Sequence, residues 1–448
     1  MPSNTQQLID LGAQALERAH ALGAEQADVL VIESADMNAG VRHGVPETIE
    51  RAESTGIGLR VFVGQSFATL STSDTSTEAL EKLASNAVAI ARVASADPFA
   101  GLADAAQLAT HIANIDGDDP FEPSMEMLQR LARDCEEAGR SVPGIANSEG
   151  ADASVGRQRI ALLTSHGFAQ SYGSTHASIA CSLIAGTGDA MERDYDYATK
   201  VYFTDLPSPE SIGQEAARRT LARLAPRKIG SQQLPVFFEP RAGRQLLSAF
   251  SSAISGSAIA RGTSFLKNAM GEAVFADSIR IIDDPLLPRG LGSHPFDAEG
   301  IAATKRAMVD AGVLQSWLLD CRSARQLGLQ STGHALRGLS SAPYPAATNL
   351  YIEPSTVSPE TLYASVPHGL LVTETIGHGT NLITGDFSVG ANGFWIENGQ
   401  VQYPVSEVTI AGNLRDMYRS MQVASDLTFR SSTNVPTILI PSMTLAGN

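Results

Sequence analysis

The sequence has 448 residues, which at about 150 residues per domain predicts two or three domains with a sizeable buried core. Hydrophobic residues make up 43% and charged residues 18% of the chain. These are the proportions of an ordinary folded protein, and they exclude extended disorder or a coiled coil for the whole chain. The 32 basic and 48 acidic residues give a net charge of −16, with no stretch rich in Lys or Arg to offset it. We therefore expect no direct nucleic-acid contact, because binding phosphates requires positive charge.

The cysteine pattern and the hydropathy predict a cytoplasmic protein. The three cysteines, Cys135, Cys181 and Cys321, lie far apart and show neither metal-ligand spacing nor the pattern of a disulfide framework. The N-terminal segment lacks a basic stretch followed by an apolar run, and no run of about 18 apolar residues occurs anywhere in the sequence. We therefore expect free thiols, no secretion and no insertion into a membrane.

Residues 1–120 are predicted to form an N-terminal α+β domain with two layers. Apolar residues recur with helical spacing over residues 8–21 and 75–94, so both segments are expected to be amphipathic helices. Between them, residues 57–74 alternate in polarity around a turn at Gly64–Ser66. This pattern is typical of an antiparallel hairpin.

Two glycines in the first strand of this hairpin, Gly56 and Gly58, have the spacing that opens a dinucleotide-binding fingerprint. The third glycine is missing, and the pair sits inside a hairpin rather than between a strand and a helix. We interpret the two glycines as positions of close packing on a strand.

Residues 121–230 are predicted to form a β-rich middle domain with flanking helices. Helical periodicity covers residues 124–139, and a polar helix is expected over residues 211–224. Between them, residues 144–203 alternate in polarity and predict a β-meander. Its turns are expected where turn-forming residues cluster, at 147–148, 165–167 and 186–188.

The third predicted domain, residues 231–448, begins after a cluster of charge, Pro and Gly. It opens with the strand-like residues 234–238 and a helix from Pro240, and then becomes short strands separated by glycine-rich turns. We expect this domain to be dominated by antiparallel sheet. The fold class that follows for the whole chain is α+β.

The histidines offer no zinc-binding helix, because no two of the nine lie three to five residues apart. Two of them, His334 and His378, lie in loops bracketed by glycines. A histidine in such a loop can bind a metal, but it is more often hydrogen-bonded within its own turn. With Asp297 and Asp386, they are the residues we single out for any unrecognised site of this chain's own.

Long segments of the sequence resemble the TldD/PmbA family, formerly called modulator of DNA gyrase, and within it the PmbA (TldE) branch. The similarity extends over nearly the whole chain, which makes it far more specific than a short motif. The segments that carry it are residues 50–74, 146–150, 164–168, 294–335 and 369–421.

The resemblance implies a cytoplasmic two-subunit peptidase. In this family the TldD partner carries a zinc-binding H-E-x-x-x-H helix and a later cysteine ligand, and the PmbA chain completes the heterodimer. The implied substrates are unfolded peptides, including the precursor of a ribosomal peptide antibiotic and an antitoxin. Zinc is therefore expected in the TldD-type partner, and no cofactor is expected on this chain.

Carried onto this chain, the motif helix falls on residues 238–256. The first histidine position is Ser248, the glutamate position is Ala249 and the second histidine position is Ala253. Serine and alanine supply neither the imidazole nor the carboxylate that holds zinc and activates water. No cysteine follows Cys321, and residues 430–434, the region where the family's partner branch has its cysteine, offer only hydroxyls and an amide. The resemblance therefore implies a chain without the family's metal site or catalytic residues.

The sequence of the same helix also predicts a structural role that is independent of any metal. Ala242, Leu246, Phe250 and Ile254 recur every four residues and form an apolar stripe, and Pro240 suits the first turn of a helix. We expect this stripe to pack against a core.

Three hypotheses follow. The leading one is a non-catalytic subunit of a TldD-type zinc metallopeptidase, which would shape the substrate channel and hold an extended peptide by main-chain pairing to sheet edges. The second is a stand-alone peptidase that uses an unrecognised metal site built from residues such as His334, His378 and Asp386. The third is a peptide-binding regulatory protein without peptidase activity, for instance a homodimer.

Overall fold

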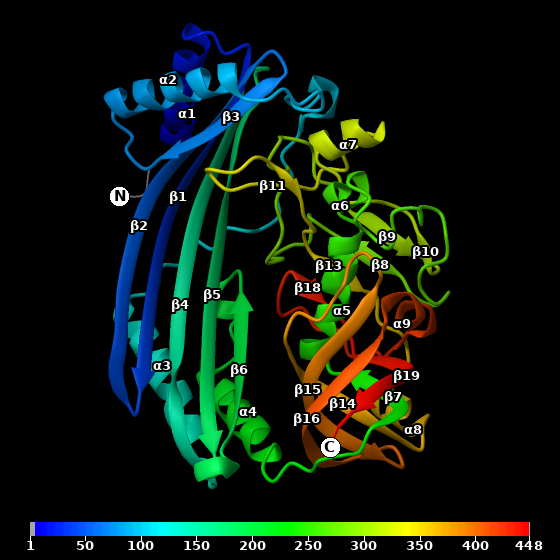
Figure 1. The fold of residues 1–448 in the computed structure, drawn as a ribbon. Coiled ribbons are helices and arrows are strands. Elements are labelled where there is room, and N and C mark those ends of the chain that lie inside the picture. Colours follow the sequence, from blue (N-terminus) through cyan, green and yellow to red (C-terminus); the bar gives the residue numbers. More distant parts are fainter. Residues whose placement is uncertain (1–4, 448) are drawn as a thin grey trace.

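The computed structural model describes residues 5–447 and confirms the α+β class. A tall sheet from the first half of the chain stands beside a C-terminal half that contains two smaller sheets (Figure 1). Within residues 5–447, no helix combines the length and the apolar character needed to cross a membrane.

The tall sheet has six antiparallel strands in the order β3-β2-β1-β4-β5-β6. Strands from both sides of residue 120 therefore share one sheet. The strands are β1 (Gln26–Arg42), β2 (Val45–Val63), β3 (Ser66–Thr72), β4 (Ile145–Thr164), β5 (Ala169–Ala185) and β6 (Glu192–Lys200).

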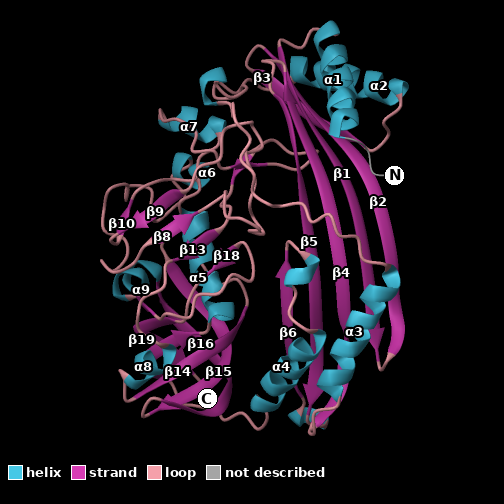
Figure 2. Ribbon diagram, turned by 180° about the vertical axis from the view of Figure 1, so that it is seen from behind, coloured by secondary structure: helices cyan, strands magenta, loops and turns pink. Residues whose placement is uncertain are grey.

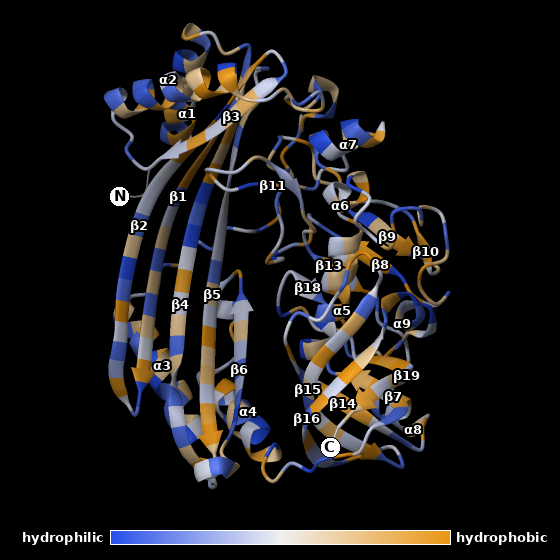
Figure 3. Ribbon diagram, in the orientation of Figure 1, coloured by the Kyte–Doolittle hydropathy of each residue, from blue (hydrophilic) through white to orange (hydrophobic). Residues whose placement is uncertain are grey.

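Helices cover one face of this sheet at its two ends (Figure 2). Odd-numbered residues of β4 point toward these helices, and the alternation along β4 and β5 is visible in Figure 3. At one end lie α1 (Thr5–Ala21) and α2 (Thr77–Val93), and at the other lie α3 (Met125–Arg140) and α4 (Pro209–Ala222).

The sequence predicted these elements well, with one error. The four helices and the hairpin around Gly64 are confirmed. The turn expected at residues 147–148 is wrong, because both residues lie inside β4, where the register shifts at two bulges. A bulge accepts the same small polar residues that mark turns, so composition alone did not separate the two.

The larger C-terminal sheet has the order β16-β15-β14-β7-β19-β17. Most of its pairs are antiparallel, as expected, although β7 and β14 run parallel. Helix α5 (Pro240–Ala253) packs with this sheet in the main core, and α8 (Pro359–Ala364) contributes to a separate cluster that includes Phe237 and Leu371. The strands are β7 (Gln232–Phe238), β14 (His368–Ile376), β15 (Asp386–Glu397), β16 (Gln400–Asn413), β17 (Gln422–Val423) and β19 (Ile438–Ala446).

The smaller sheet of this half has the order β10-β9-β8-β13-β18. Its strands are β8 (Ile281–Asp283), β9 (Arg306–Asp310), β10 (Val313–Leu314), β13 (Leu350–Ile352) and β18 (Thr433–Asn434). A two-stranded ribbon, β11 (Ala335–Leu336) and β12 (Tyr344–Pro345), reaches toward the tall sheet (Figure 1). The remaining α-helices are α6 (Gly256–Ala260), α7 (Cys321–Leu327) and α9 (Leu414–Ser420).

A buried ion cluster joins the ribbon to the tall sheet. The carboxylate of Asp28 on β1 accepts hydrogen bonds from Arg60 on β2 and from Arg337, which follows β11. Glu299 lies 3.7 Å from Arg60 and adds a second buried carboxylate. Burial alone would raise the pKa of Asp28, but the two guanidiniums more than offset it and the pKa is lowered. The charged form of Asp28 is therefore the one that the fold stabilises.

Close packing joins the same two parts. A methyl group added at Gly56 or Gly58 would overlap Leu339 in the loop between β11 and β12. The interpretation of these glycines as packing positions is confirmed.

We predict that Asp28→Asn destabilises the protein strongly. It removes the carboxylate shared by two guanidiniums that are almost fully buried, a change that costs about 3–5 kcal/mol. The midpoint of urea unfolding should fall clearly. The control is Glu53→Gln, which breaks an exposed pair with Arg51 on the same sheet and should leave the midpoint in place. Equal midpoints for the two variants would contradict this role of Asp28.

Candidate functional site

Helix α5, which carries the predicted motif positions, is anchored by its apolar stripe. Ala242, Leu246, Phe250 and Ile254 are all buried in the main core, as predicted. Pro240 occupies the first turn, where its missing N–H costs nothing. The helix is therefore a core element whose position does not require a metal.

The three motif positions do not converge on one face of α5. Ser248 is exposed, whereas Ala249 and Ala253 are buried, Ala253 completely. Residues five apart on a regular helix are separated by about 140°, so side chains at 248 and 253 point in different directions. Ser248 instead shares a face with Arg244 and Ser252, each four residues away.

Residues 430–434, the region where the partner branch has its cysteine, lie beside this helix. Arg244 donates a hydrogen bond from Nη1 to Oγ of Ser431 at 3.1 Å. The segment is pinned by Asn434, whose side-chain oxygen accepts from the backbone N–H groups of Arg430 and Ser431. The structure thus brings together the helix and the segment that the family resemblance pairs, but their side chains are a guanidinium, hydroxyls and an amide. These donors do not fit zinc.

His334 and Asp297 are both buried and serve local structure. Nδ1 of His334 lies 2.8 Å from the Thr332 hydroxyl, and Nε2 lies 3.3 Å from Oδ1 of Asp283. Asp297 accepts three backbone N–H groups, from residues 299, 301 and 335, at 2.9–3.0 Å. Burial and the neighbouring Glu299 raise the pKa of Asp297 to about 7.

His378 and Asp386 lie elsewhere, in and after the exposed loop between β14 and β15. Asp386 accepts hydrogen bonds from the Thr384 hydroxyl at 2.7 Å and from the Asn413 amide at 3.1 Å. The exposed loop thus holds His378 and Asp386, whereas His334 and Asp297 are buried elsewhere. Across residues 5–447, no group of three or more His, Cys, Asp or Glu side chains is placed to hold a metal ion.

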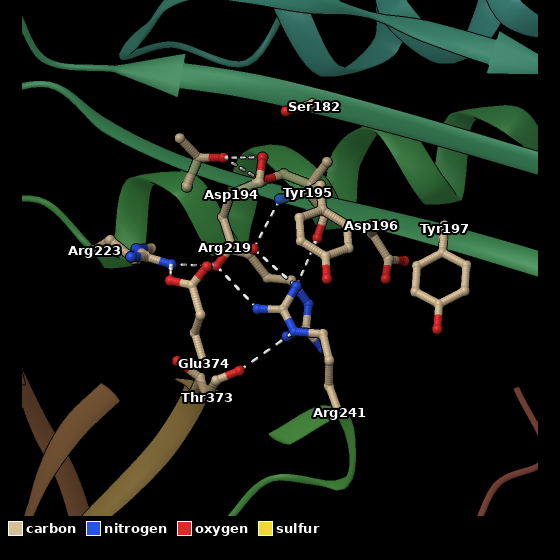
Figure 4. Close-up of polar contacts among 12 residues, drawn as sticks. Ser182, Asp194, Tyr195, Asp196, Tyr197, Arg219, Arg223, Arg241, Thr373 and Glu374 are labelled. Carbon is tan, nitrogen blue, oxygen red and sulfur yellow. Dashed lines mark hydrogen bonds and ion pairs between the residues drawn. The ribbon is translucent and has the colours of Figure 1, made fainter. Parts of the chain in front are cut away.

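A second ion network, which the sequence did not reveal, joins β6 and α4 to α5 and β14 (Figure 4). Arg241 on α5 binds both carboxylate oxygens of Asp194 on β6, at 2.9 and 3.2 Å. Arg223, which follows α4 directly, binds Glu374 on β14 at 2.8 Å. Burial would raise the pKa of Asp194, but Arg241 more than offsets it and the pKa is lowered. Arg241 and Asp194 are 47 residues apart, so no local sequence pattern indicates that they pair.

A cavity of about 630 Å³ lies beside this network. Its polar wall comes from α4, α5 and β6, and its apolar wall from α8, β14 and β15. The cavity therefore lies where the tall sheet and the C-terminal half meet, next to the start of helix α5.

The sequence matches three profiles of one family: PmbA/TldA metallopeptidase domain 1 over residues 27–91, the central domain over residues 118–224 and the C-terminal domain over residues 231–447. The chain belongs to the PmbA/TldD metallopeptidase family. The resemblance seen in the sequence is thereby confirmed.

PmbA relatives match the chain over almost its full length. A protein of Escherichia coli O157:H7 named metalloprotease PmbA is 37% identical over 426 residues, which are 95% of this chain and 93% of the relative. A protein of Haemophilus influenzae named metalloprotease PmbA homolog is 36% identical over 451 residues, covering 100% and 98%.

Solved structures of PmbA/TldD type share the fold. A proposed modulator of DNA gyrase from Bacteroides thetaiotaomicron has a TM-score of 0.91 at 27% identity, covering 100% of both chains. TldE from Thermococcus kodakarensis has a TM-score of 0.88 at 20% identity, covering 98% of this chain and 100% of that one, and supports the fold alone.

We predict that histidines at the two outer motif positions have unequal effects on stability. Ala253→His forces a large polar ring into a fully buried site, and overpacking of this kind costs about 1–3 kcal/mol. Ser248→His adds the same ring at an exposed position and should be nearly neutral. Urea unfolding of the two variants is the measurement. Equal stability would show that position 253 faces open space.

We also predict that Asp297→Asn makes the protein's stability less dependent on pH between about pH 4 and pH 7. With its pKa raised to about 7, Asp297 holds a proton in the folded state that the unfolded chain releases near its ordinary pKa of about 4. The free energy of unfolding therefore falls as pH rises through this window. The substitution removes that contribution.

Urea unfolding at a series of pH values measures this slope. The control is Asp386→Asn, whose exposed carboxyl has its pKa lowered by hydrogen bonds from Thr384 and Asn413 and titrates below the window. A wild-type slope in Asp297→Asn would contradict the assignment.

Proposed function

We propose that this chain is the non-catalytic, PmbA/TldE-like subunit of a zinc metallopeptidase complex that degrades or processes unfolded peptides. The observation that carries the proposal is the combination of full-length similarity to proteins named metalloprotease PmbA with motif positions that hold Ser248, Ala249 and Ala253. A chain that keeps the family's fold and lacks its metal ligands needs a second chain to supply them.

In this proposal the zinc and the water-activating glutamate belong to a TldD-type partner, and the two chains form a heterodimer in the cytoplasm. The three cysteines support a reducing compartment, because all are buried free thiols. The contribution of this chain is to complete the assembly and to help hold the substrate.

The edge of the tall sheet supports a role in holding extended peptides. Strand β3 pairs with residues 57–63 of β2, whereas residues 45–56 pair with β1 on one side only within the described part of the chain. This leaves a long strand edge at which backbone groups are available for main-chain pairing. Such pairing tolerates many sequences, which suits unfolded substrates.

We predict that this chain alone contains no zinc, and that peptidase activity appears only when it is mixed with the zinc-containing TldD-type chain of the same organism. The measurements are metal content by mass spectrometry, association by size-exclusion chromatography with light scattering, and hydrolysis of an unstructured fluorogenic peptide. Each is made on this chain alone, on the partner and on the mixture. Glutamate to glutamine in the partner's motif should abolish hydrolysis and leave association intact.

Two outcomes would replace the proposal by its alternatives. Chelator-sensitive hydrolysis by the isolated chain would indicate a stand-alone peptidase and direct attention to His334, His378 and Asp386. Failure to associate with the TldD-type chain, together with a stable homodimer, would indicate a peptide-binding regulatory protein.

A further inference from the structure

The cavity between the tall sheet and the C-terminal half contains one arginine that is not neutralised. Five arginines line it, and four of these have a carboxylate partner at 2.6–2.9 Å: Arg218 with Glu215, Arg219 with Glu239, Arg241 with Asp194 and Arg430 with Asp196. Within residues 5–447, Arg244 has no carboxylate within 4 Å. Its side chain donates to neutral acceptors, the Ser431 hydroxyl at 3.1 Å and the Arg241 carbonyl at 3.5 Å.

Two of the acidic residues that line the cavity are ion-paired with other arginines, and the other two accept hydrogen bonds from neutral groups. Asp194 and Glu239 belong to the ion pairs with Arg241 and Arg219. Asp426 accepts hydrogen bonds from the backbone N–H and the hydroxyl of Thr437, at 2.8 and 2.7 Å. Glu360 is exposed in the first turn of α8, where hydrogen bonds from its own backbone and from Ser358 hold its pKa low. Arg244 is therefore the positive charge in this cavity that still lacks a counter-ion.

Another part of the cavity lining is apolar. Tyr363 of α8, Leu371 of β14 and Phe394 of β15 line it, and Val401 and Val435 extend it. A volume of about 630 Å³ is in the range of small-molecule sites. A ligand that fits both walls has an apolar body and a carboxylate, because a guanidinium recognises a carboxylate by paired hydrogen bonds.

We propose that this cavity binds the free C-terminal carboxylate of a peptide that ends in an apolar residue, with Arg244 as the counter-ion. The last side chain would pack against Tyr363, Leu371 and Phe394. The choice of a peptide rests on the proposed function, whereas the preference for a carboxylate rests on Arg244 and its surroundings alone.

The position of Arg244 strengthens this assignment. It lies one helical turn before Ser248 on the same face of α5, and it contacts the segment around Ser431. The predicted remnant of the metal site and this fixed positive charge are therefore adjacent. A peptide anchored at Arg244 would have its last residues beside that remnant.

The test uses the full chain without a partner and without added metal. The probe is a fluorescein-labelled hexapeptide of glycine and serine with a C-terminal phenylalanine, compared with the same peptide as its C-terminal amide. Fluorescence anisotropy should show the free acid binding at least about tenfold more tightly, as expected for a hydrogen-bonded charge. Equal affinities, or no binding of either peptide at 1 mM, would overturn the proposal.

Two variants test the assignment to Arg244. Arg244→Gln should remove the preference for the acid, while its circular dichroism and urea unfolding report whether it folds. Arg193→Gln on β6, an exposed arginine paired with Glu149 outside the cavity, should keep the preference. If the folded Arg244→Gln variant still prefers the free acid, a group other than Arg244 binds the carboxylate.

Octanoate distinguishes a peptide from another apolar carboxylate. It should compete more weakly than the unlabelled peptide acid, and tighter competition would overturn the assignment of a peptide. The proposed function is tested by other measurements, namely association with the TldD-type chain and hydrolysis of a peptide. The two proposals therefore succeed or fail separately.

Discussion

The carboxylate of Asp28 is the contact on which the arrangement of the two halves depends. It lies on the face of the tall sheet opposite the helices, and it is shared by Arg60 of the same sheet and Arg337 of the C-terminal half. Buried charges lose their hydration, so such a cluster is favourable only in the geometry that satisfies every member. An apolar contact tolerates sliding, whereas this cluster selects one position of the ribbon over the sheet. The close approach of Leu339 to Gly58 completes the same attachment.

The second ion network fixes the opposite end of the junction between the tall sheet and the C-terminal half. Because the two parts are attached at two separate places, a cavity is left between them. Arg241 and Arg430 donate to the backbone carbonyls of Tyr195 and Tyr197 on β6. Guanidiniums thus occupy acceptors that a seventh strand would otherwise use, and the edge of the sheet is closed by side chains. Because β6 is held through side chains rather than through a continuous ladder, space remains between it and the C-terminal sheet.

The sequence predicted the elements that depend on local periodicity, but it did not predict contacts between residues that are distant in the chain. Helices α1 to α4, the hairpin at Gly64 and the apolar stripe of α5 were all predicted, because each repeats over a few residues. Asp28 and Arg337 are 309 residues apart, and no local pattern indicates that they meet. The same limit applies to the site. Family resemblance located α5 and the segment around Ser431, but the separation of Arg244 from the carboxylates of residues 5–447 is visible only in three dimensions.

The composition of α5 shows that the place of a helix in the fold can be independent of the side chains on its exposed face. Its buried face is set by Ala242, Leu246, Phe250 and Ile254, and these residues stabilise the core whatever the exposed face carries. Substitution on the exposed face is therefore nearly free of cost to folding. A metal ion and a guanidinium both supply positive charge to a bound oxyanion, but only the metal also activates water. On α5 the positive charge is that of Arg244, one helical turn before Ser248, the position that the family resemblance assigns to the first histidine.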